Sequence, residues 1–243
     1  MFIHIDGIDG AGKSTLLHAA TAWAEAHGLR VFDAAEWSRT NGRIPTLEDV
    51  GDADMLHTAE PTHAWIGAAI RNEIIREGSP YDARFAAEAF SLDRGVQYRR
   101  LILPFLAAKP GRWVIQDRGV LSSLAYQPLQ SEREGTATPV TKEWLATLDG
   151  NRLAIEHAPD TFVFVDVDAD IAQERLAGRT DKVDGDRYER ADFQTALAER
   201  YRDPATSAPL TERGTELVIL DGAKSKQDLA ADMTALLDRM ASR

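Results

Sequence analysis

The clearest shortage in this chain of 243 residues is cysteine, of which it has none. Disulfide bonds and thiolate metal sites are therefore excluded. The sequence also lacks any apolar run near the roughly 18 residues that a membrane-spanning helix requires. It has no segment with the composition of a secretory signal, since a core strand is predicted directly from Phe2. We therefore expect a cytoplasmic protein without a membrane partner.

Positive charge is also scarce. The chain has 28 Lys and Arg against 39 Asp and Glu, which gives a net charge of -11 and a pI near 5.0. A nucleic-acid backbone is normally bound by an excess of basic residues, so this balance argues against a DNA or RNA partner. A small phosphorylated ligand bound by a few local arginines remains compatible with it.

Metal-binding patterns are missing as well. The histidines, His57 and His63 among them, show no spacing that predicts a zinc site or a catalytic triad. Three aspartates alternate after one apolar run, at Asp166, Asp168 and Asp170. We interpret them as caps of the following helix rather than as metal ligands.

What the sequence does contain is an alternation of apolar runs and helical patterns along one domain, residues 1–243. The runs predict strands at residues 2–5, 29–32, 113–116, 161–167 and 217–220. Such alternation is typical of an α/β fold, here with a five-stranded parallel sheet and helices on both faces. Two polar stretches, about 33–58 and 128–140, are predicted as loop insertions. The last helix is expected over residues 225–240.

The start of the chain carries the strongest chemical signal. The first apolar run leads into the pattern G-x-x-x-x-G-K-[ST] of a phosphate-binding loop, with a helix predicted after it. Its glycines let successive N–H groups face one anion, and the helix adds its dipole; a tight turn without a ligand is the alternative. We predict an ATP site in which Lys13 reaches the β- and γ-phosphates and Ser14 binds Mg²⁺. The residues of this site are Gly7, Ile8, Asp9, Gly10, Ala11, Gly12, Lys13, Ser14 and Thr15.

Asp117 and Arg118 follow the third predicted strand. Ligands of parallel α/β sheets bind beyond the carboxyl ends of the strands, so both side chains are expected near the phosphate loop. There an aspartate can hold Mg²⁺ through water, and an arginine can bridge two phosphate groups. A surface ion pair would explain the same two residues without any ligand.

With these residues the chain resembles the thymidylate kinase family over most of its length. The similar segments are the phosphate loop, Glu60-Pro61-Thr62 with the later Ile70-Arg71, the helix motif Phe90-x-x-x-Arg94, and the element DRGVLSSLAYQ from Asp117 to Gln127. Asp186-Arg187-Tyr188-Glu189 looks like part of the family's arginine-bearing lid, here about 175–190. The motifs occur in the family's order, which is more specific than any one of them.

The resemblance implies a role for each acceptor residue. Phe90 would stack on a pyrimidine base and Arg94 would donate to a base carbonyl oxygen, although a helix aromatic is more often part of the core. Ser123 and Gln127 would read the base edge, and Tyr126 would favour deoxyribose. Asp9 would meet the 3′-hydroxyl, or serve only to form the turn. The implied acceptor residues are Asp9, Glu60, Pro61, Arg71, Phe90, Arg94, Arg118, Ser123, Tyr126 and Gln127.

Phosphoryl transfer requires aligned phosphates and neutralised charge, so the catalytic residues should be mostly cations. The predicted set is Lys13, Arg118, Asp9, Arg179 and Arg187, with Ser14 and Asp117 at the Mg²⁺ ion. Arg175 and Arg190 are substitutes for the two lid arginines. A lid arginine is needed because Gly10 stands where some family members carry an arginine in the loop.

The chain departs from the family on the acceptor side. Gly119 stands where the family usually has an aromatic residue or histidine, and we expect a wider cavity there. His63 stands where many members have a small residue, and the insertion at 128–140 replaces a glycine-rich stretch. Transfer of a phosphoryl group from ATP is therefore predicted more firmly than the identity of its acceptor.

The sequence thus predicts an enzyme that transfers the γ-phosphoryl group of MgATP to a deoxypyrimidine nucleoside 5′-monophosphate, with dTMP as the first choice. Another or modified deoxynucleoside monophosphate is the nearest alternative. A nucleotide-dependent NTPase switch is a second, although the N-K-x-D element of a GTPase is absent, and a silent paralogue is a third that intact Lys13, Asp117 and Arg118 oppose. The resemblance also implies a homodimer.

Overall fold

The computed structural model describes residues 1–178, 187–188 and 190–242. These residues form one parallel sheet of six strands in the order β2-β3-β4-β1-β5-β6. The expected number of five was therefore wrong by one. The strands are β1 (Phe2–Asp6), β2 (Val31–Asp33), β3 (Met55–Ala59), β4 (Trp113–Asp117), β5 (Thr161–Asp166) and β6 (Glu216–Asp221).

Strand β1 lies at the centre of the sheet and is buried along its whole length. It pairs in parallel with β4 on one side and with β5 on the other. A parallel strand covered on both faces is rich in apolar residues, which is why Phe2, Ile3 and Ile5 stood out in the sequence, although His4 and Asp6 of the same strand are buried as well. Its carboxyl end delivers the phosphate loop between the ends of two neighbouring strands.

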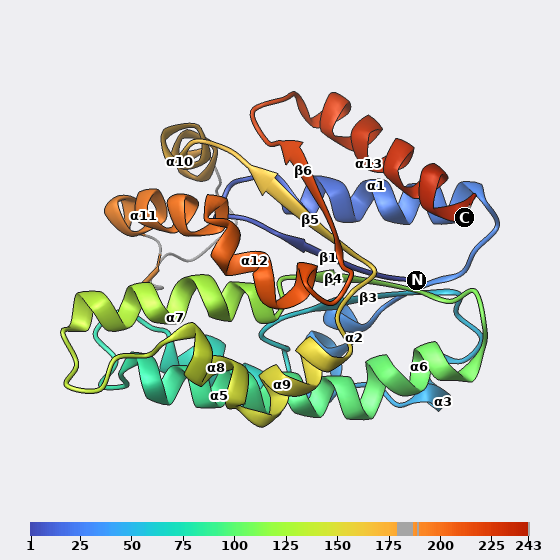
Figure 1. The fold of residues 1–243 in the computed structure, drawn as a ribbon. Helices are drawn as coiled ribbons and strands as arrows, with labels where there is room; N and C mark the ends of the chain where they lie inside the picture. The colour runs from blue at the N-terminus through green and yellow to red at the C-terminus, as the bar shows by residue number, and fades with distance from the viewer. Residues whose placement is uncertain (179–186, 189, 243) are drawn as a thin grey trace.

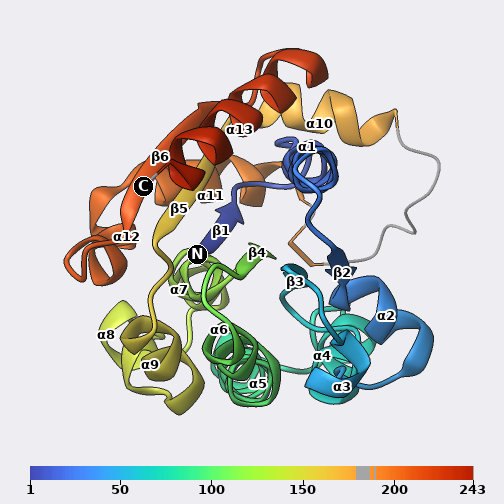
Figure 2. The ribbon, with the colours of Figure 1, turned by 90° about the vertical axis from the view of Figure 1, so that its right-hand side faces the viewer.

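Helices cover both faces of the sheet (Figures 1 and 2). Helices α1 and α13 pack together on one face, and α5 packs with α7 and α9 on the other. The longer helices are α1 (Lys13–Ala26), α5 (Ala83–Gln97), α7 (Val120–Glu134), α11 (Ala191–Arg202) and α13 (Lys226–Ala241). The others are α2 (Ala34–Asn41), α3 (Leu47–Val50), α4 (Trp65–Ala69), η1 (Ile70–Ile74), η2 (Tyr98–Ile102), α6 (Leu103–Ala108), α8 (Lys142–Thr147), α9 (Asp149–Glu156), α10 (Ala169–Ala177) and α12 (Pro204–Thr211).

The polar stretch 33–58 is not the loop that we expected. Asp33 caps α2 by accepting a hydrogen bond from Glu36 N at 2.8 Å, and Thr46 with Asp49 forms a capping box on α3. Strand β3 then completes the stretch and pairs with β2 and β4. Short capped helices contain few apolar residues, so they read as loop in the sequence.

The second predicted insertion, 128–140, was wrong in its first half. Helix α7 continues through Pro128 to Glu134 before the chain leaves it. Leu129, Gln130 and Ser131 are all buried on this extension. The final helix was predicted correctly: Leu229, Met233, Leu236 and Leu237 of α13 are buried. Among the described residues, no helix is both long and apolar enough to cross a membrane.

Candidate active site

The phosphate loop joins β1 to α1 and leaves almost no room around its glycines. A Cβ atom at Gly10 would lie 2.3 Å from the carbonyl oxygen of Ala172, and one at Gly7 would lie 2.6 Å from that of Val165. The φ angle of Gly10 is +82°, which other residues rarely adopt. The loop therefore accepts no side chain at position 10, and an arginine for the transferred group has to come from another segment.

Lys13 begins α1 and folds back over the loop. Its Nζ donates to the carbonyl oxygens of Gly7 at 3.1 Å and Ile8 at 2.9 Å. Burial, and next the charge of Arg118, lowers the pKa of Lys13. Ser14, the next residue, is exposed in the first turn of α1. The lysine is thus held inside the loop, where an anion bound by the loop would meet it.

Arg118 reaches the same loop from the end of β4. Its Nη2 donates to Asp9 Oδ1 at 2.5 Å, and its Nη1 donates to the Gly7 carbonyl oxygen at 3.2 Å. The backbone of Arg118 has a φ of +64°, an uncommon value for a residue with a side chain. Arg118 does form an ion pair, with Asp9. Its side chain is only 17% exposed, however, so this is not the exposed surface ion pair that was the alternative explanation.

A cavity lies beside the loop, beyond the carboxyl ends of β1, β3 and β4. Every residue that the resemblance assigned to the acceptor lines it, and Asp117 lines it too. The remaining lining residues are not among the acceptor residues that the resemblance implied. These are Ile75, Gly119, Ser122 and Tyr188.

The floor of this cavity contains a buried ion pair between Arg94 and Glu60. Arg94 Nε and Nη2 donate to Glu60 Oε2 at 2.9 and 2.6 Å, and Gln116 donates to the other carboxylate oxygen. Arg94 also donates to the carbonyl oxygen of Gly119, to Ser123 Oγ and to Asn151 Oδ1. Of its five N–H groups, these partners leave one on Nη1 for a ligand among the described residues. The side chain is mainly a fixed part of the cavity wall.

Arg71 lies at another part of the wall and is held differently. Its guanidinium donates to the carbonyl oxygens of Pro61 and Thr62, and no described carboxylate forms an ion pair with it. Burial, reinforced by the charges of Arg118 and Arg39, lowers the pKa of Arg71 to about 10, so it stays charged at neutral pH. A charged guanidinium without a paired carboxylate is suited to bind a phosphate group.

Two buried oxygen atoms in the cavity wall have no hydrogen-bond partner among the described residues. They are Oδ1 of Asp117 and Oε1 of Gln127. Buried polar atoms are nearly always paired, so an unpaired one marks a position where a ligand, ion or water belongs. Phe90 presents a half-buried ring to the same cavity, which differs from the fully covered ring of a core residue.

Gly119 does not widen the cavity in the way we expected. A Cβ atom at this position would lie 2.5 Å from Nδ1 of His4, which is buried in β1. The missing side chain would therefore point toward His4 rather than into the cavity. The imidazole fills the space that a side chain at position 119 would need.

The predicted lid arginines are placed unevenly. Arg179 lies outside the described residues, as does most of the range 175–190. Arg187 donates to the carbonyl oxygens of Ile74 and Tyr81, and it contacts Ser79. Arg175 donates to the carbonyl oxygens of Gly222, Ala223 and Lys224, whereas Arg190 is exposed beside Asp192. Neither Arg175 nor Arg187 lines the cavity beside the loop.

The interpretation of the aspartates after β5 as helix caps was wrong. Asp168 stands at the N-cap of α10 but makes no side-chain hydrogen bond to that helix. Asp166 and Asp168 instead accept from Arg202 at 2.8 and 3.0 Å. They fix α11 next to the end of β5.

Comparison with known proteins gives a consistent result. The family described as thymidylate kinase matches residues 45–233. A probable thymidylate kinase of Thermococcus onnurineus is 34% identical over 98% of this chain and 97% of its own length, and one of Thermococcus gammatolerans is 30% identical over 98% and 96%. A thymidylate kinase of Chromobacterium violaceum is 28% identical over 100% of this chain and 95% of its own.

Proposed function

The chain belongs to the thymidylate kinase family, and we propose that it transfers the γ-phosphoryl group of ATP to dTMP, giving ADP and dTDP. One observation carries the proposal beyond family membership. The acceptor residues, which come from segments far apart in the sequence, line a single cavity that opens beside the phosphate loop. Donor and acceptor phosphates bound in these two places would be adjacent, as direct transfer requires.

Charge neutralisation is the main task of the protein in this reaction. Lys13 lies inside the loop and would contact the β- and γ-phosphates. Arg118 lies between the loop and the cavity, and its Nη2, which now pairs with Asp9, would contact the phosphates while Nη1 stays on the Gly7 carbonyl oxygen. Arg71 would hold the acceptor phosphate from the other side.

The base would be recognised by the deeper wall. Phe90 offers an aromatic face, Arg94 offers one remaining N–H, and Gln127 offers a carbonyl oxygen to which no described residue donates. A pyrimidine with a carbonyl and an N–H on its edge satisfies both polar groups. Tyr126 crosses the cavity near Arg118, whose guanidinium carbon lies 5.4 Å from the centre of the tyrosine ring. It is the candidate to exclude a ribose 2′-hydroxyl.

Mg²⁺ fits the residues present. The buried Oδ1 of Asp117 has no hydrogen-bond partner among the described residues, and Ser14 is exposed at the start of α1. Across the described part of the chain, no group of three or more histidine or carboxylate side chains could hold a metal. Mg²⁺ commonly takes one or two protein ligands, with water and phosphate oxygens completing its shell. The ion would neutralise phosphate charge, and Asp117 would orient its water.

A further cation for the moving phosphoryl group is proposed from Arg179 or Arg190. None of the described lid arginines lines the cavity, but Arg175 and Arg187 are held by backbone carbonyl groups, whereas Arg190 is exposed and pairs with Asp192. The loop itself accepts no arginine at Gly10. Arg179 and Arg190 are therefore the two candidates.

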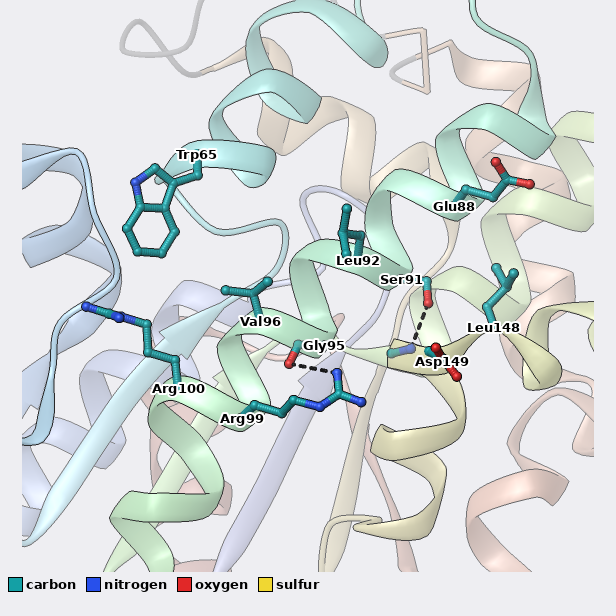
Figure 3. A pocket seen from close by; sticks show the side chains of 11 residues that line it. Trp65, Glu88, Ser91, Leu92, Gly95, Val96, Arg99, Arg100, Leu148 and Asp149 are labelled. Atoms are coloured by element: carbon teal, nitrogen blue, oxygen red, sulfur yellow. Dashed lines mark hydrogen bonds between the residues drawn. The ribbon is translucent and has the colours of Figure 1, made fainter.

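We propose the homodimer through the outer face of α5 shown in Figure 3. Trp65 and Leu92 are 47% and 59% exposed there, and Val96 and Leu148 line the same groove. Glu88 and Asp149 lie on this face with Arg99 and Arg100. A face with both charge signs is complementary to a second copy related by a twofold axis. Light scattering should give twice the chain mass for the wild type and the single chain mass for Leu92→Glu.

The decisive experiment measures ADP release with MgATP and each common ribo- and deoxynucleoside monophosphate in separate reactions. We expect fast turnover with dTMP, and much slower turnover with dUMP and with purine nucleotides. Preference for another deoxynucleotide would retain the mechanism and change the acceptor. ATP turnover that does not depend on any acceptor would instead favour an NTPase switch. The absence of any turnover would favour a silent paralogue.

A further inference from the structure

The carboxylate of Asp6 is buried directly beneath the phosphate loop. It stands at the end of β1 and is fully inaccessible. Its Oδ1 accepts hydrogen bonds from Gly7 N at 2.8 Å and from the Tyr201 hydroxyl at 2.7 Å, and Oδ2 accepts from Ser122 Oγ at 2.8 Å. Burial raises the pKa of Asp6, while Arg118, Tyr201, Lys13 and Ser122 all favour its charged form.

Arg118 depends on this carboxylate. Its Nη1 lies 3.4 Å from Asp6 Oδ1, while its Nη2 reaches Asp9 on the loop. The two Nη groups are thereby divided between a buried anchor and the surface that a phosphate would contact. The buried carboxylate thus holds one side of the guanidinium while the other side faces the loop.

Tyr201 is the group that fixes the anchor from outside the loop. It comes from α11, far along the chain, and its ring is buried in a stack on Phe164 with centroids 5.5 Å apart. Its hydroxyl donates to Asp6 Oδ1 and also lies 3.0 Å from Ser122 Oγ. A stacked ring cannot shift easily, so the hydroxyl holds Asp6 at a fixed distance from Arg118.

We propose that Tyr201, acting through Asp6, is a positioning residue that keeps Arg118 in the orientation required for phosphoryl transfer. Ser122 is the second donor in the same assembly. The proposal rests on the proposed function, since it assigns Arg118 to the phosphates. Tyr201 itself touches no substrate and acts only through the carboxylate and the guanidinium.

Tyr201→Phe tests this because it removes the hydroxyl and keeps the ring. We expect kcat with MgATP and dTMP to fall about tenfold, as for a lost transition-state contact of modest strength, with both KM values within about twofold of wild type. Tyr81→Phe is the matched control. Among the described residues the Tyr81 hydroxyl bonds only to Glu73, at 3.3 Å on an exposed face, and its loss should leave kcat unchanged.

A double-mutant cycle with Arg118→Lys distinguishes positioning from general destabilisation. If Tyr201 acts through Arg118, Tyr201→Phe should lower kcat much less in the Arg118→Lys background than in the wild type. An equal loss in both backgrounds would overturn the proposal. So would wild-type kcat in a folded Tyr201→Phe protein.

Ser122→Ala provides a second variant should Tyr201→Phe lose its fold, and it should show the same pattern with a smaller loss of kcat. An unchanged kcat there would count against the assembly. The proposed function fails separately: wild-type protein without dTMP-dependent turnover would overturn it, and this inference with it. Active wild type with unaffected variants would overturn the inference alone.

Discussion

The imidazole of His4 occupies the position that a side chain at Gly119 would need, since a Cβ atom on Gly119 would lie 2.5 Å from His4 Nδ1. The two residues lie on β1 and at the start of α7, and the Gly119 carbonyl oxygen accepts a hydrogen bond from Arg94. His4 on the strand therefore takes up the volume that a larger residue at position 119 would occupy.

Gly119→Ala should consequently destabilise the protein by about 1–3 kcal/mol, because the methyl group overpacks a filled site. The double variant His4→Ala/Gly119→Ala should be more stable than the sum of the single effects predicts, by about 1 kcal/mol or more. Urea unfolding measures both quantities. Gly178→Ala is the control, since its Cβ would lie 3.7 Å from the nearest atom. Strictly additive changes in the free energy of unfolding would show that His4 and the methyl group at position 119 do not compete for the same space.

His4 should also make stability depend on pH. Burial lowers the pKa of His4 from 6.5 to about 3, so the folded protein keeps the ring neutral where the unfolded chain protonates it. Stability is then complete above about pH 6.5 and decreases toward pH 3, with a loss of about 2 kcal/mol by pH 5 from this residue alone. His4→Asn should flatten that slope, whereas His157→Asn on the surface should not. Unfolding curves at several pH values measure it.

Lys13→Ala should lower kcat by roughly two to three decades or more, because the ammonium would stabilise transition-state charge. The fold should survive, although the side chain also holds the loop through Gly7 and Ile8. Lys109→Ala is the matched control, since Lys109 pairs with Asp54 at the surface. Turnover close to the wild-type rate in Lys13→Ala would remove the loop lysine from the mechanism.

Phe90→Ala should raise the KM for dTMP with little change in that for ATP. Base stacking on an aromatic ring contributes about 1–3 kcal/mol, or roughly 5- to 150-fold in affinity. Phe85→Ala on the same helix is the control, because Phe85 is 48% exposed and lies outside the cavity. Loss of thermal stability with unchanged kinetics would show that Phe90 only packs in the core.

Asp117→Asn should raise the Mg²⁺ concentration for half-maximal activity by about tenfold or more, as for a carboxylate that orients metal-bound water. Asp168→Asn serves as the control, since Asp168 accepts from Arg202 instead. The titration is made at saturating ATP and dTMP. An unchanged Mg²⁺ requirement would separate Asp117 from the metal.

Sequence patterns predicted those parts of the fold in which the hydrophobicity of the residues matches their burial. Strands β1, β4 and β5 are buried on both faces, and each contains a run of apolar residues that can be recognised in the sequence. Strand β3 was missed because its apolar run is only Met55 and Leu56, and the polar His57 and Thr58 that follow are buried by the fold. The extension of α7 was missed for a similar reason: Gln130 is buried against Glu134, which no local pattern reveals.

The site shows the same division. Residues within one motif, such as Phe90 and Arg94, were found through their spacing. Tyr188 was quoted within a motif but received no role, because only the structure places it over the cavity. Asn151 and Tyr201 carry no local signal at all; their importance comes from partners 57 and 195 residues away. Long-range pairing of this kind is not encoded in spacing.

Arg94 links chain segments that lie 34, 25 and 57 residues from it, at Glu60, Gly119 and Asn151. Contacts of such high separation form late in folding, after the loops between them have closed. A chain still being synthesised, with α7 outside the ribosome but α9 incomplete, would already contain the glycines and the lysine of the phosphate loop. It would lack Asn151, so the wall of the acceptor cavity around Arg94 would be incomplete. Tight acceptor binding should consequently appear only once the chain through α9 has been made and folded.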